Sequence, residues 1–439
     1  MPRLAHLLPR GHLLTCLSLL SSAAGFLSQL FLAKLFGASA SVDAYFFSLG
    51  TPIFLGGLVA GAINFYLTPR FRAQASTGHD GGVRLEVPQV LALAFRLNLL
   101  TVAAALFGAP LQYWTLPASS VIRTDPNLPF LLLGAWLFAG CIVHQSTIVA
   151  LLTSKDRLLQ AALLPLFPPL MSMAMMFATG SLIGVGSILT GQLLGSLAAI
   201  VYGASVVRET RAVTDHQSVS RLIRLVLSGL ASAAMATACF TAYPLIDSLL
   251  APRAGPSIMS QMSYAQRVII GLGTLLIAAP LAVLANRFSD LAQAGNRQQF
   301  LSTYRKAMMV SLVPVMGLTL LLIFAGENIV GLMLGRGKFG PAEVHGVGLA
   351  ARFMAPGMLL MLLTSLTFRA VFALRSGPRS LALVGPVWVV TYASLGIALL
   401  DRGIVGLATA YSFTWLVSAG LAVWILLRCT QEHFTENPS

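Results

Sequence analysis

The sequence predicts an all-α protein that crosses a membrane many times, and three observations lead to this prediction. Of its 439 residues, 56% are hydrophobic and only 10% are charged, whereas soluble domains carry roughly 25% charged residues. The mean hydropathy is +0.82. The apolar stretches are mostly continuous and roughly twenty residues long, the length of a helix that crosses the hydrocarbon core. Transmembrane β-strands would instead alternate over segments of about ten residues.

About twelve of these stretches qualify as membrane-spanning helices, because every backbone polar group inside a bilayer must find its partner within the segment. They are expected at roughly 12–36, 44–68, 89–108, 129–153, 158–179, 184–207, 223–249, 258–285, 307–325, 346–371, 381–400 and 404–427.

A short internal match divides these spans into two lobes of six. Tyr45 and the pair Arg70-Phe71 in the first half have counterparts in Tyr264 and the pair Arg287-Phe288 in the second half. Two lobes of like orientation around a central cavity are a common transporter plan. The expected domains are an N-terminal lobe over 1–207, a cytoplasmic linker over 208–222, and a C-terminal lobe with a short cytoplasmic tail over 223–439.

The basic residues predict the orientation. If the N-terminus is cytoplasmic, most of the 28 Lys and Arg residues fall on the cytoplasmic side, as the positive-inside rule requires. We therefore expect both termini in the cytoplasm. The same loops account for the net charge of +14, because basic residues there face anionic lipid head groups. Membrane lipids, and not nucleic acid, are the predicted partners of these cations.

The sequence predicts neither a catalytic set, nor a metal site, nor a cofactor. Its 4 Cys and 7 His residues show no ligand spacing, and it lacks the G-x-x-x-x-G-K-[ST] loop of nucleotide hydrolysis. A polyprenyl-dependent membrane glycosyltransferase or ligase is the enzyme alternative. The outer loops carry only scattered acids, Asp125, Glu327 and Glu343, so we predict that the protein is not an enzyme.

Four basic residues lie within predicted spans or near their ends. An Arg near the bilayer centre costs about 2.5–3.5 kcal/mol on insertion scales. Arg267 lies deep in its span and is expected to line a cavity and bind an anion; a structural pair with Asp247 is the alternative. Lys34 and Arg352 lie nearer the outer side and Arg96 nearer the cytoplasm, where snorkelling to the interface is the alternative to cavity lining.

These cations outnumber the acids within the spans, where only Asp43 and Asp247 compete. An anionic substrate is therefore predicted. Proline and glycine, as in Pro356-Gly357, are expected to bend several spans, because proline removes a helix hydrogen bond. Bent helices around a cavity suit alternating access, and the alternative is that kinks and small residues, as in 191–199, merely let helices pack closely.

Several stretches resemble a known family. They are "GFLSQLFLAKLFGASASVDAYFFSLGTP" (25–52), "IDSLLAPRAGPSIMSQMSYAQRV" (246–268), "LMLGRGKF" (332–339) and "FRAVFAL" (368–374). In order along nearly the whole chain, they are similar to the MurJ/MviN lipid II flippases of the multidrug/oligosaccharidyl-lipid/polysaccharide exporter superfamily. The resemblance implies a flippase that moves undecaprenyl-pyrophosphate-linked saccharides across the bacterial inner membrane by alternating access. A multidrug/cation antiporter of the same superfamily is the alternative, but it would need more acidic residues.

The resemblance extends to some site positions and fails at others. Asp43 and Arg267 match family positions, and Lys34 stands where a cavity arginine is usual. An arginine-containing motif of the first span is replaced by Ser28 and Gln29, and two arginines of the second span are replaced by the glycines at 56–57. The lost charges would engage pyrophosphate or head-group oxygens, so a polyprenyl-linked saccharide other than lipid II gains support.

Besides the cationic residues, the residues expected to line or gate the cavity are Asp43, Ser28, Gln29, Asp247 and Tyr264. In some relatives an acid at the position of Asp247 takes part in a sodium site. The further polar residues of that site have no counterparts in this sequence, so the coupling ion stays open.

Overall fold

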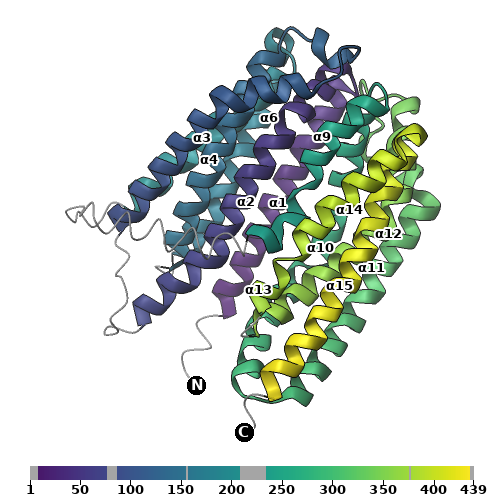
Figure 1. The fold of residues 1–439 in the computed structure, drawn as a ribbon. Coiled ribbons are helices and arrows are strands. Elements are labelled where there is room, and N and C mark those ends of the chain that lie inside the picture. Colours follow the sequence, from purple (N-terminus) through teal and green to yellow (C-terminus); the bar gives the residue numbers. More distant parts are fainter. Residues whose placement is uncertain (1–7, 77–86, 155–156, 208–233, 375–376, 436–439) are drawn as a thin grey trace. The chain divides into compact units, whose positions relative to one another are not determined.

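Figure 1 shows the computed structural model of the chain, which describes residues 8–76, 87–154, 157–207, 234–374 and 377–435. These residues form helices joined by turns, and no strand occurs among them, which confirms the all-α prediction. Contacts divide the chain into two compact units, Met1–Phe36 with Ala40–Ala234 and Gly37–Ser39 with Met235–Ser439. The expected linker 208–222 lies outside the described residues, so the domain boundaries stay a prediction.

The first unit is built around α4. Its helices are α1 (Leu8–Phe36), α2 (Ala40–Ser76), α3 (Val87–Thr115), α4 (Leu128–Ser154), α5 (Leu158–Leu163), α6 (Phe167–Ile183) and α7 (Gly186–Val207), with 3-10 turns at Val121–Thr124 and Leu164–Leu166. α4 contacts α2, α3, α5 and α7, and Figure 1 shows α2, α3 and α4 running alongside one another.

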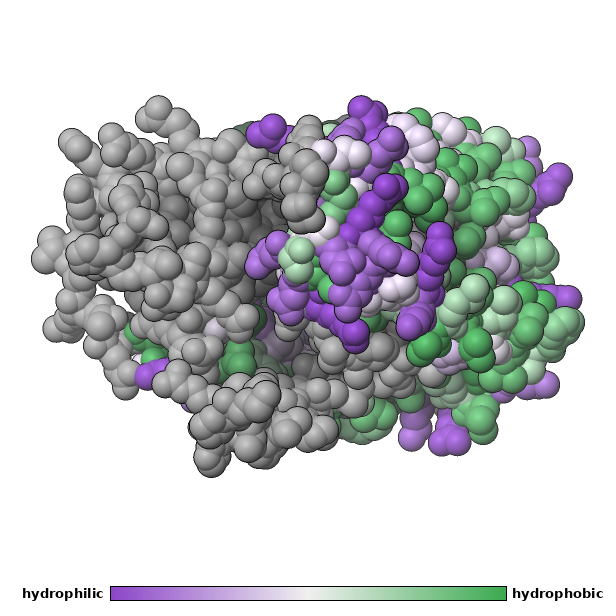
Figure 2. All heavy atoms as spheres, turned by 90° about the horizontal axis from the view of Figure 1, so that it is seen from below, coloured by the Kyte–Doolittle hydropathy of each residue, from purple (hydrophilic) through white to green (hydrophobic). Residues whose placement is uncertain are grey.

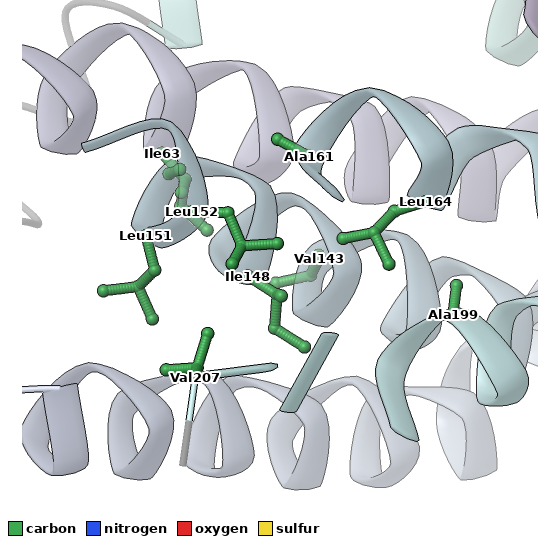
Figure 3. Close-up of a cluster of buried hydrophobic side chains, with 10 residues drawn as sticks. Ile63, Val143, Ile148, Leu151, Leu152, Ala161, Leu164, Ala199 and Val207 are labelled. Atoms are coloured by element: carbon green, nitrogen blue, oxygen red, sulfur yellow. The ribbon is translucent and has the colours of Figure 1, made fainter. Parts of the chain in front are cut away.

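Apolar side chains from several helices interdigitate in the core of this unit. Figure 3 shows this core. The buried side chains include Ile63 of α2, Ile148 and Leu152 of α4, Leu164 of the 3-10 turn between α5 and α6, and Val207 of α7. Lipid tails are as apolar as these side chains, so helix association within a membrane depends on close packing and interhelical hydrogen bonds. The core therefore stabilises the unit mainly through van der Waals contact.

Glycines bring α7 against α6. A Cβ atom at Gly191 would lie 2.4 Å from Ser172 Cα, and one at Gly195 would lie 2.5 Å from the Phe167 carbonyl oxygen. Both contacts are with backbone, so any larger residue would push the helices apart. The close helix approach expected from residues 191–199 is confirmed.

The predicted span 158–179 is divided by its prolines. α5 ends at Leu163, a 3-10 turn over Leu164–Leu166 contains Pro165, and α6 begins at Phe167 with Pro168 and Pro169 in its first turn. Proline has no N–H to donate, and the first turn of a helix is where no intrahelical acceptor exists for that N–H. The chain therefore restarts its helix at these residues.

The second unit is built around α12. Its helices are α9 (Tyr243–Ala254), α10 (Ile258–Gln293), α11 (Arg297–Leu334), α12 (Pro341–Phe372), α13 (Gly377–Leu381), α14 (Val384–Ala398) and α15 (Gly403–Thr435), with a helical segment Ala234–Thr241 and a 3-10 turn Leu400–Arg402. α12 contacts α10, α11 and α15, and α15 also contacts α14.

Among the described residues, 8 helices are long and apolar enough to cross a membrane, or 9 if a bent pair counts as one span. The chain is therefore a multi-pass membrane protein, while the count of twelve stays a prediction. The bent pair is Ala234–Thr241 and Tyr243–Ala254, which meet at 41°. The sequence predicts one span there; Pro244, in the first turn of α9, explains the break because it cannot continue the hydrogen-bond ladder.

The outer surface of the second unit is divided between apolar flanks and a polar end. Val313 and Phe324 of α11 are 73% and 80% exposed, as expected for side chains that face lipid. The turn between α10 and α11 exposes Gln293 and residues 296–299. Figure 2 shows the molecule from below. Among the coloured residues, hydrophilic side chains (purple) gather near the middle of this view, and hydrophobic side chains (green) lie mostly toward its right edge.

The hydroxyl of Ser412 bonds to the backbone of α12 beside its proline. Pro356 lies inside α12, and the Gly357 N–H donates to Ser412 Oγ of α15 at 3.0 Å. Ser412 Oγ in turn donates to the Phe353 carbonyl oxygen at 2.6 Å. The hydroxyl thus contacts an N–H and a carbonyl that are four residues apart, the spacing of a helical hydrogen-bond pair. A Cβ atom at Gly357 would lie 2.8 Å from Ser412 Cα, so glycine permits this approach.

Candidate functional site

In the first unit, the predicted cations are exposed and the neutral pair on α1 is buried. Lys34 of α1 and Arg96 of α3 are both exposed. Ser28 Oγ donates to the Gly25 carbonyl oxygen at 2.9 Å, and Gln29 Nε2 donates to Ser28 Oγ at 3.3 Å. Among the residues that the structure describes, the buried Gln29 Oε1 atom has no hydrogen-bond partner. The hydrogen bonds of this pair therefore stay within one helix.

α2 carries a buried acid at its start. Asp43 lies in the first turn of α2 and is 3% exposed, a position where the helix dipole favours negative charge. Farther along, Tyr45 is fully buried and its hydroxyl accepts a hydrogen bond from Gln192 Nε2 of α7 at 3.0 Å. Gln112 Nε2 of α3 donates to the Phe47 carbonyl oxygen at 2.7 Å. Polar contacts thus hold α2 against α3 and α7.

In the second unit, three helices meet at Asp247. This side chain, on α9, is 1% exposed. Its Oδ1 atom accepts a hydrogen bond from the Tyr392 hydroxyl of α14 at 2.5 Å, and its Oδ2 atom accepts one from Gln266 Nε2 of α10. A buried carboxylate is tolerated only where donors converge on it. Here both donors are neutral and come from different helices.

Arg267 follows Gln266 on α10 and is half-buried. The sequence left open a structural pair of Arg267 with Asp247; the two hydrogen bonds that hold Asp247 instead come from Gln266 and Tyr392. Arg267 and Asp247 both interact electrostatically with the half-buried Tyr243, one turn before Asp247 on α9. The cation and the acid therefore lie around one phenol.

Aromatic rings enclose the acid on the side of α14 and α15. Trp388 and Tyr392 of α14 are one turn apart, with ring centroids 5.1 Å from each other. The Tyr392 ring lies 6.1 Å from that of Tyr411, and the Trp388 ring lies 5.7 Å from that of Trp415, both on α15. All four side chains are at most 1% exposed. This wall excludes water from the Tyr392 hydroxyl.

Tyr264, the predicted counterpart of Tyr45, anchors the stretch Gly37–Ser39 within the second unit. Its hydroxyl donates to the Gly37 carbonyl oxygen at 3.0 Å, and its ring meets Phe339 edge-on at 5.4 Å. A Cβ atom at Gly37 would lie 2.7 Å from the Lys338 carbonyl oxygen. Tyr264 is therefore a buried anchor for a tight turn, and its gating role stays a prediction.

Arg352 is exposed on α12, immediately before Phe353, whose carbonyl oxygen accepts from Ser412. Of the four predicted substrate-binding cations, Arg267 is thus the one that the structure places beside a network of buried polar groups. Lys34, Arg96 and Arg352 are exposed within their own units. Their convergence with Arg267 on one cavity stays a prediction.

The sequence does not predict the two hydrogen-bond partners of Asp247, which are Gln266 and Tyr392. Gln266 precedes Arg267 in the predicted span 258–285. An amide inside an apolar span could have indicated a contact between helices, because such an amide needs a hydrogen-bond partner on another helix. Tyr392 gave a weaker signal, since a lone tyrosine in an apolar run resembles a packing residue. Among the described residues, no three His, Cys, Asp or Glu side chains form a group that could hold a metal ion.

Comparisons with known proteins agree with this architecture. The family model described as lipid II flippase MurJ matches residues 32–437. No curated protein matches the chain in sequence. A solved structure of the lipid II flippase MurJ in an inward closed conformation is similar with a TM-score of 0.79 and 16% identity, over 96% of this chain and 90% of that one.

Two further solved structures show the same fold at low identity. An inward-facing multidrug resistance MATE family transporter of the MOP superfamily has a TM-score of 0.71 and 12% identity, over 95% of this chain and 96% of that one. A MOP superfamily transporter from Pyrococcus furiosus Vc1 (DSM3638) has a TM-score of 0.59 and 12% identity, over 96% and 93%.

Proposed function

Because the chain belongs to the MurJ family of lipid II flippases, we propose that it flips an undecaprenyl-pyrophosphate-linked saccharide across the bacterial inner membrane by alternating access. The cargo is lipid II or a related cell-envelope precursor. The family match over residues 32–437 is the observation that carries this proposal. The similarity to MATE transporters is one of fold, and the few acids of the spans argue against a carrier of cationic drugs.

The pyrophosphate of the cargo binds to cationic side chains, with Arg267 as the principal contact and Lys34 as the second. A guanidinium presents several N–H donors in a planar fork that matches phosphate oxygens. Arg267 is half-buried, so its charge acts in surroundings of lower dielectric than bulk water. Arg352 and Arg96 contribute positive potential to the path of the head group. The glycines at 56–57 and the neutral Ser28-Gln29 pair favour a saccharide other than lipid II.

Flipping requires no covalent chemistry, so the chain acts as a transporter and not as an enzyme. The lobes expose the site first to the cytoplasm and then to the outer side, while the polyprenyl tail stays in the bilayer. Both termini lie in the cytoplasm, where the basic loops face anionic lipid. The membrane potential contributes about 2.3 kcal/mol per charge per 100 mV to any step that moves the cationic site.

Reconstituted vesicles test the proposal. Fluorescent undecaprenyl-pyrophosphate-linked saccharide is placed in one leaflet, and its appearance in the other is followed for wild type and Arg267→Ala. Loss of a charge-assisted hydrogen bond worth about 1.5–3 kcal/mol lowers the initial rate roughly tenfold or more. Arg428→Ala is the matched control, because Arg428 is exposed and pairs with Glu432 on the same helix.

Equal flipping rates for wild type and Arg267→Ala would remove Arg267 from the binding site. The cargo itself is identified by rescue of a strain depleted of its lipid II flippase. Rescue assigns lipid II, and flipping of other polyprenyl-linked saccharides without rescue assigns a different glycan precursor. If no polyprenyl-linked saccharide moves, the proposed function is wrong.

A further inference from the structure

α2 contains a proline, and a glutamine of α3 bonds to backbone carbonyl groups of α2 about one turn before it. Pro52 is buried, and α2 continues as a helix through it. Gln112 Nε2 donates to the Phe47 carbonyl oxygen at 2.7 Å and to the Ser48 carbonyl oxygen at 3.4 Å. We propose that Gln112 is a positioning residue for transport, because its amide supplies the donor that Pro52 lacks and so sets the angle of α2 at this point.

The Ser48 carbonyl oxygen needs a donor from outside its own helix. In a regular α-helix it would accept from the N–H group of the residue four positions later. That residue is Pro52, which has no N–H group. Ser48 is fully buried, so bulk water does not replace the missing donor. The Ser48 hydroxyl is already engaged, because it donates to the Tyr45 carbonyl oxygen at 2.8 Å. Gln112 of α3 therefore takes the place of the missing backbone donor.

The amide of Gln112 is oriented by the two carbonyl groups. Gln112 is 4% exposed, and an amide turned the other way would bring its oxygen against two acceptors. Its Nε2 atom carries two N–H groups, enough for both carbonyls. The longer of the two bonds goes to Ser48, and a bend at Pro52 that turns the Ser48 carbonyl toward the amide would shorten it. The bonding of Gln112 therefore depends on the angle of α2.

The parts of α2 before and after Pro52 have different neighbours. Before it, the Tyr45 hydroxyl accepts a hydrogen bond from Gln192 of α7 at 3.0 Å. One turn after it, Gly56 packs against Ala139 of α4, and a Cβ atom on Gly56 would lie 3.1 Å from Ala139 Cβ. Contacts between such small residues allow packed helices to slide by small amounts. The part of α2 after the proline can therefore pivot while the part before it is held.

The angle at Pro52 decides where the glycines at 56–57 lie. By resemblance these glycines stand at cavity positions, so they border the proposed path of the head group. Hinge positions far from a binding site commonly govern the steps that open and close it. Without the Gln112 bond the angle is not fixed, and movement of one part of α2 is not passed on to the other. The inference rests on the proposed function, and it predicts a slower reopening of the cavity with unchanged cargo binding at Arg267.

Gln112→Leu removes the donor and keeps a side chain of similar size. In the vesicle assay it is expected to lower the initial flipping rate at saturating cargo about fivefold, the factor that corresponds to one neutral hydrogen bond. Its affinity for undecaprenyl pyrophosphate in detergent should equal that of wild type. Backbone amides on either side of Pro52 should exchange with deuterium faster than in wild type, because local opening of the helix there becomes easier.

A double-mutant cycle connects the effect to the proline. Pro52→Ala restores an N–H group for the Ser48 carbonyl, so α2 loses its pivot and no longer depends on Gln112. Flipping is expected to fall in Pro52→Ala, and adding Gln112→Leu should lower it no further, since coupled residues show non-additive effects. Amide exchange around position 52 should be slow in Pro52→Ala and in the double variant.

Gln192→Leu is the matched control. It removes the hydrogen bond that Gln192 donates to the Tyr45 hydroxyl, a contact of another helix with the same part of α2. This bond does not involve a carbonyl that faces a proline. Its fractional effect on flipping should therefore be the same with and without Pro52→Ala, and amide exchange around Pro52 should stay that of wild type.

The outcomes distinguish this inference from the function on which it rests. If wild type moves no polyprenyl-linked saccharide, the proposed function fails and the transport role of Gln112 fails with it. If wild type flips the cargo and Gln112→Leu matches it in rate and in amide exchange, only this inference fails. Equal fold losses from Gln112→Leu with and without Pro52→Ala also overturn it. Should Gln112→Leu not fold, Pro52→Ala is expected to restore folding, and a double variant that stays unfolded overturns the inference.

Discussion

Two buried glutamines, one in each unit, show how differently this protein treats polar groups inside apolar helices. Gln29 on α1 donates to Ser28, its neighbour in the chain, and its Oε1 atom has no hydrogen-bond partner within the described part of the chain. Gln266 on α10 donates to Asp247 on α9, which also accepts from Tyr392 on α14. Both amides are at most 5% exposed. The Gln29 amide bonds within its own helix. The Gln266 amide bonds to a carboxylate at which three helices meet.

The difference follows from charge. A buried carboxylate costs several kcal/mol unless donors surround it, so the sequence around Asp247 must supply them from other helices. A neutral amide is less costly to leave half-satisfied. In the described part of the chain, the Ser28-Gln29 pair of α1 therefore makes no hydrogen bond to another helix, whereas hydrogen bonds to Asp247 connect α9 with α10 and α14. We expect the second unit to be the more sensitive to loss of a single polar side chain.

The matched pair Gln266→Leu and Gln29→Leu tests this comparison with the largest expected effect. Gln266→Leu leaves a buried, ionised oxygen without its donor and should cost about 2–3 kcal/mol. Gln29→Leu removes an amide whose oxygen is already unpaired, so its effect should stay within about 1 kcal/mol. The measurement is the shift in thermal unfolding midpoint of each variant in detergent. Equal shifts would show that Asp247 does not depend on Gln266.

The sequence alone predicts the part of this site that carries charge. Asp247 and Arg267 stand out because ionisable residues inside membrane spans are rare and costly. Gln266 and Tyr392 do not stand out, because a neutral polar residue in an apolar run is compatible with many environments. Their role depends on the meeting of α9, α10 and α14, which local patterns cannot predict.

The membrane spans can likewise be predicted from the sequence, whereas the contacts at a kink cannot. The continuous apolar stretches predict where the helices lie, since length and composition decide whether a segment can cross a bilayer. Pro356-Gly357 predicts a kink in α12, but the contact of the Ser412 hydroxyl from α15 with this backbone depends on packing between distant segments. The exposure of Lys34 and Arg352 likewise depends on how α1 and α12 are rotated about their axes. Both helices carry apolar residues on all sides, so the sequence does not predict which face of each helix is buried.

The turn at Gly37 provides the next effect in size. Gly37 has φ of +68°, a left-handed conformation that costs a residue with a Cβ atom about 1–2 kcal/mol. The added methyl group would also lie 2.7 Å from the Lys338 carbonyl oxygen. Gly37→Ala should therefore lower the unfolding midpoint by an amount corresponding to about 2 kcal/mol.

Gly25→Ala is the control for this prediction. Gly25 lies within α1, and a Cβ atom there would meet nothing within 4 Å. Alanine is the better helix former by about 1 kcal/mol, so this variant should be neutral or slightly more stable. A Gly37→Ala protein as stable as wild type would mean that the stretch Gly37–Ser39 is not held against Tyr264 and Lys338.

The smallest expected effect concerns the Ser412 hydroxyl that bonds to the backbone of α12. Ser412→Ala removes the group that accepts from the Gly357 N–H and donates to the Phe353 carbonyl. These two backbone groups are a regular i to i+4 pair, so they can bond directly once the hydroxyl is gone. The cost should therefore be only about 1 kcal/mol, and α12 should become straighter at Pro356.

Ser365→Ala is the matched control, because the Ser365 hydroxyl donates to the Leu362 carbonyl oxygen of its own helix. Spin labels on either side of Pro356 would report the bend of α12 in wild type and both variants. We expect the distance between the labels to lengthen in Ser412→Ala alone. An unchanged distance with a loss well above 1 kcal/mol would mean that Phe353 and Gly357 cannot approach, and that Pro356 fixes the bend without help from α15.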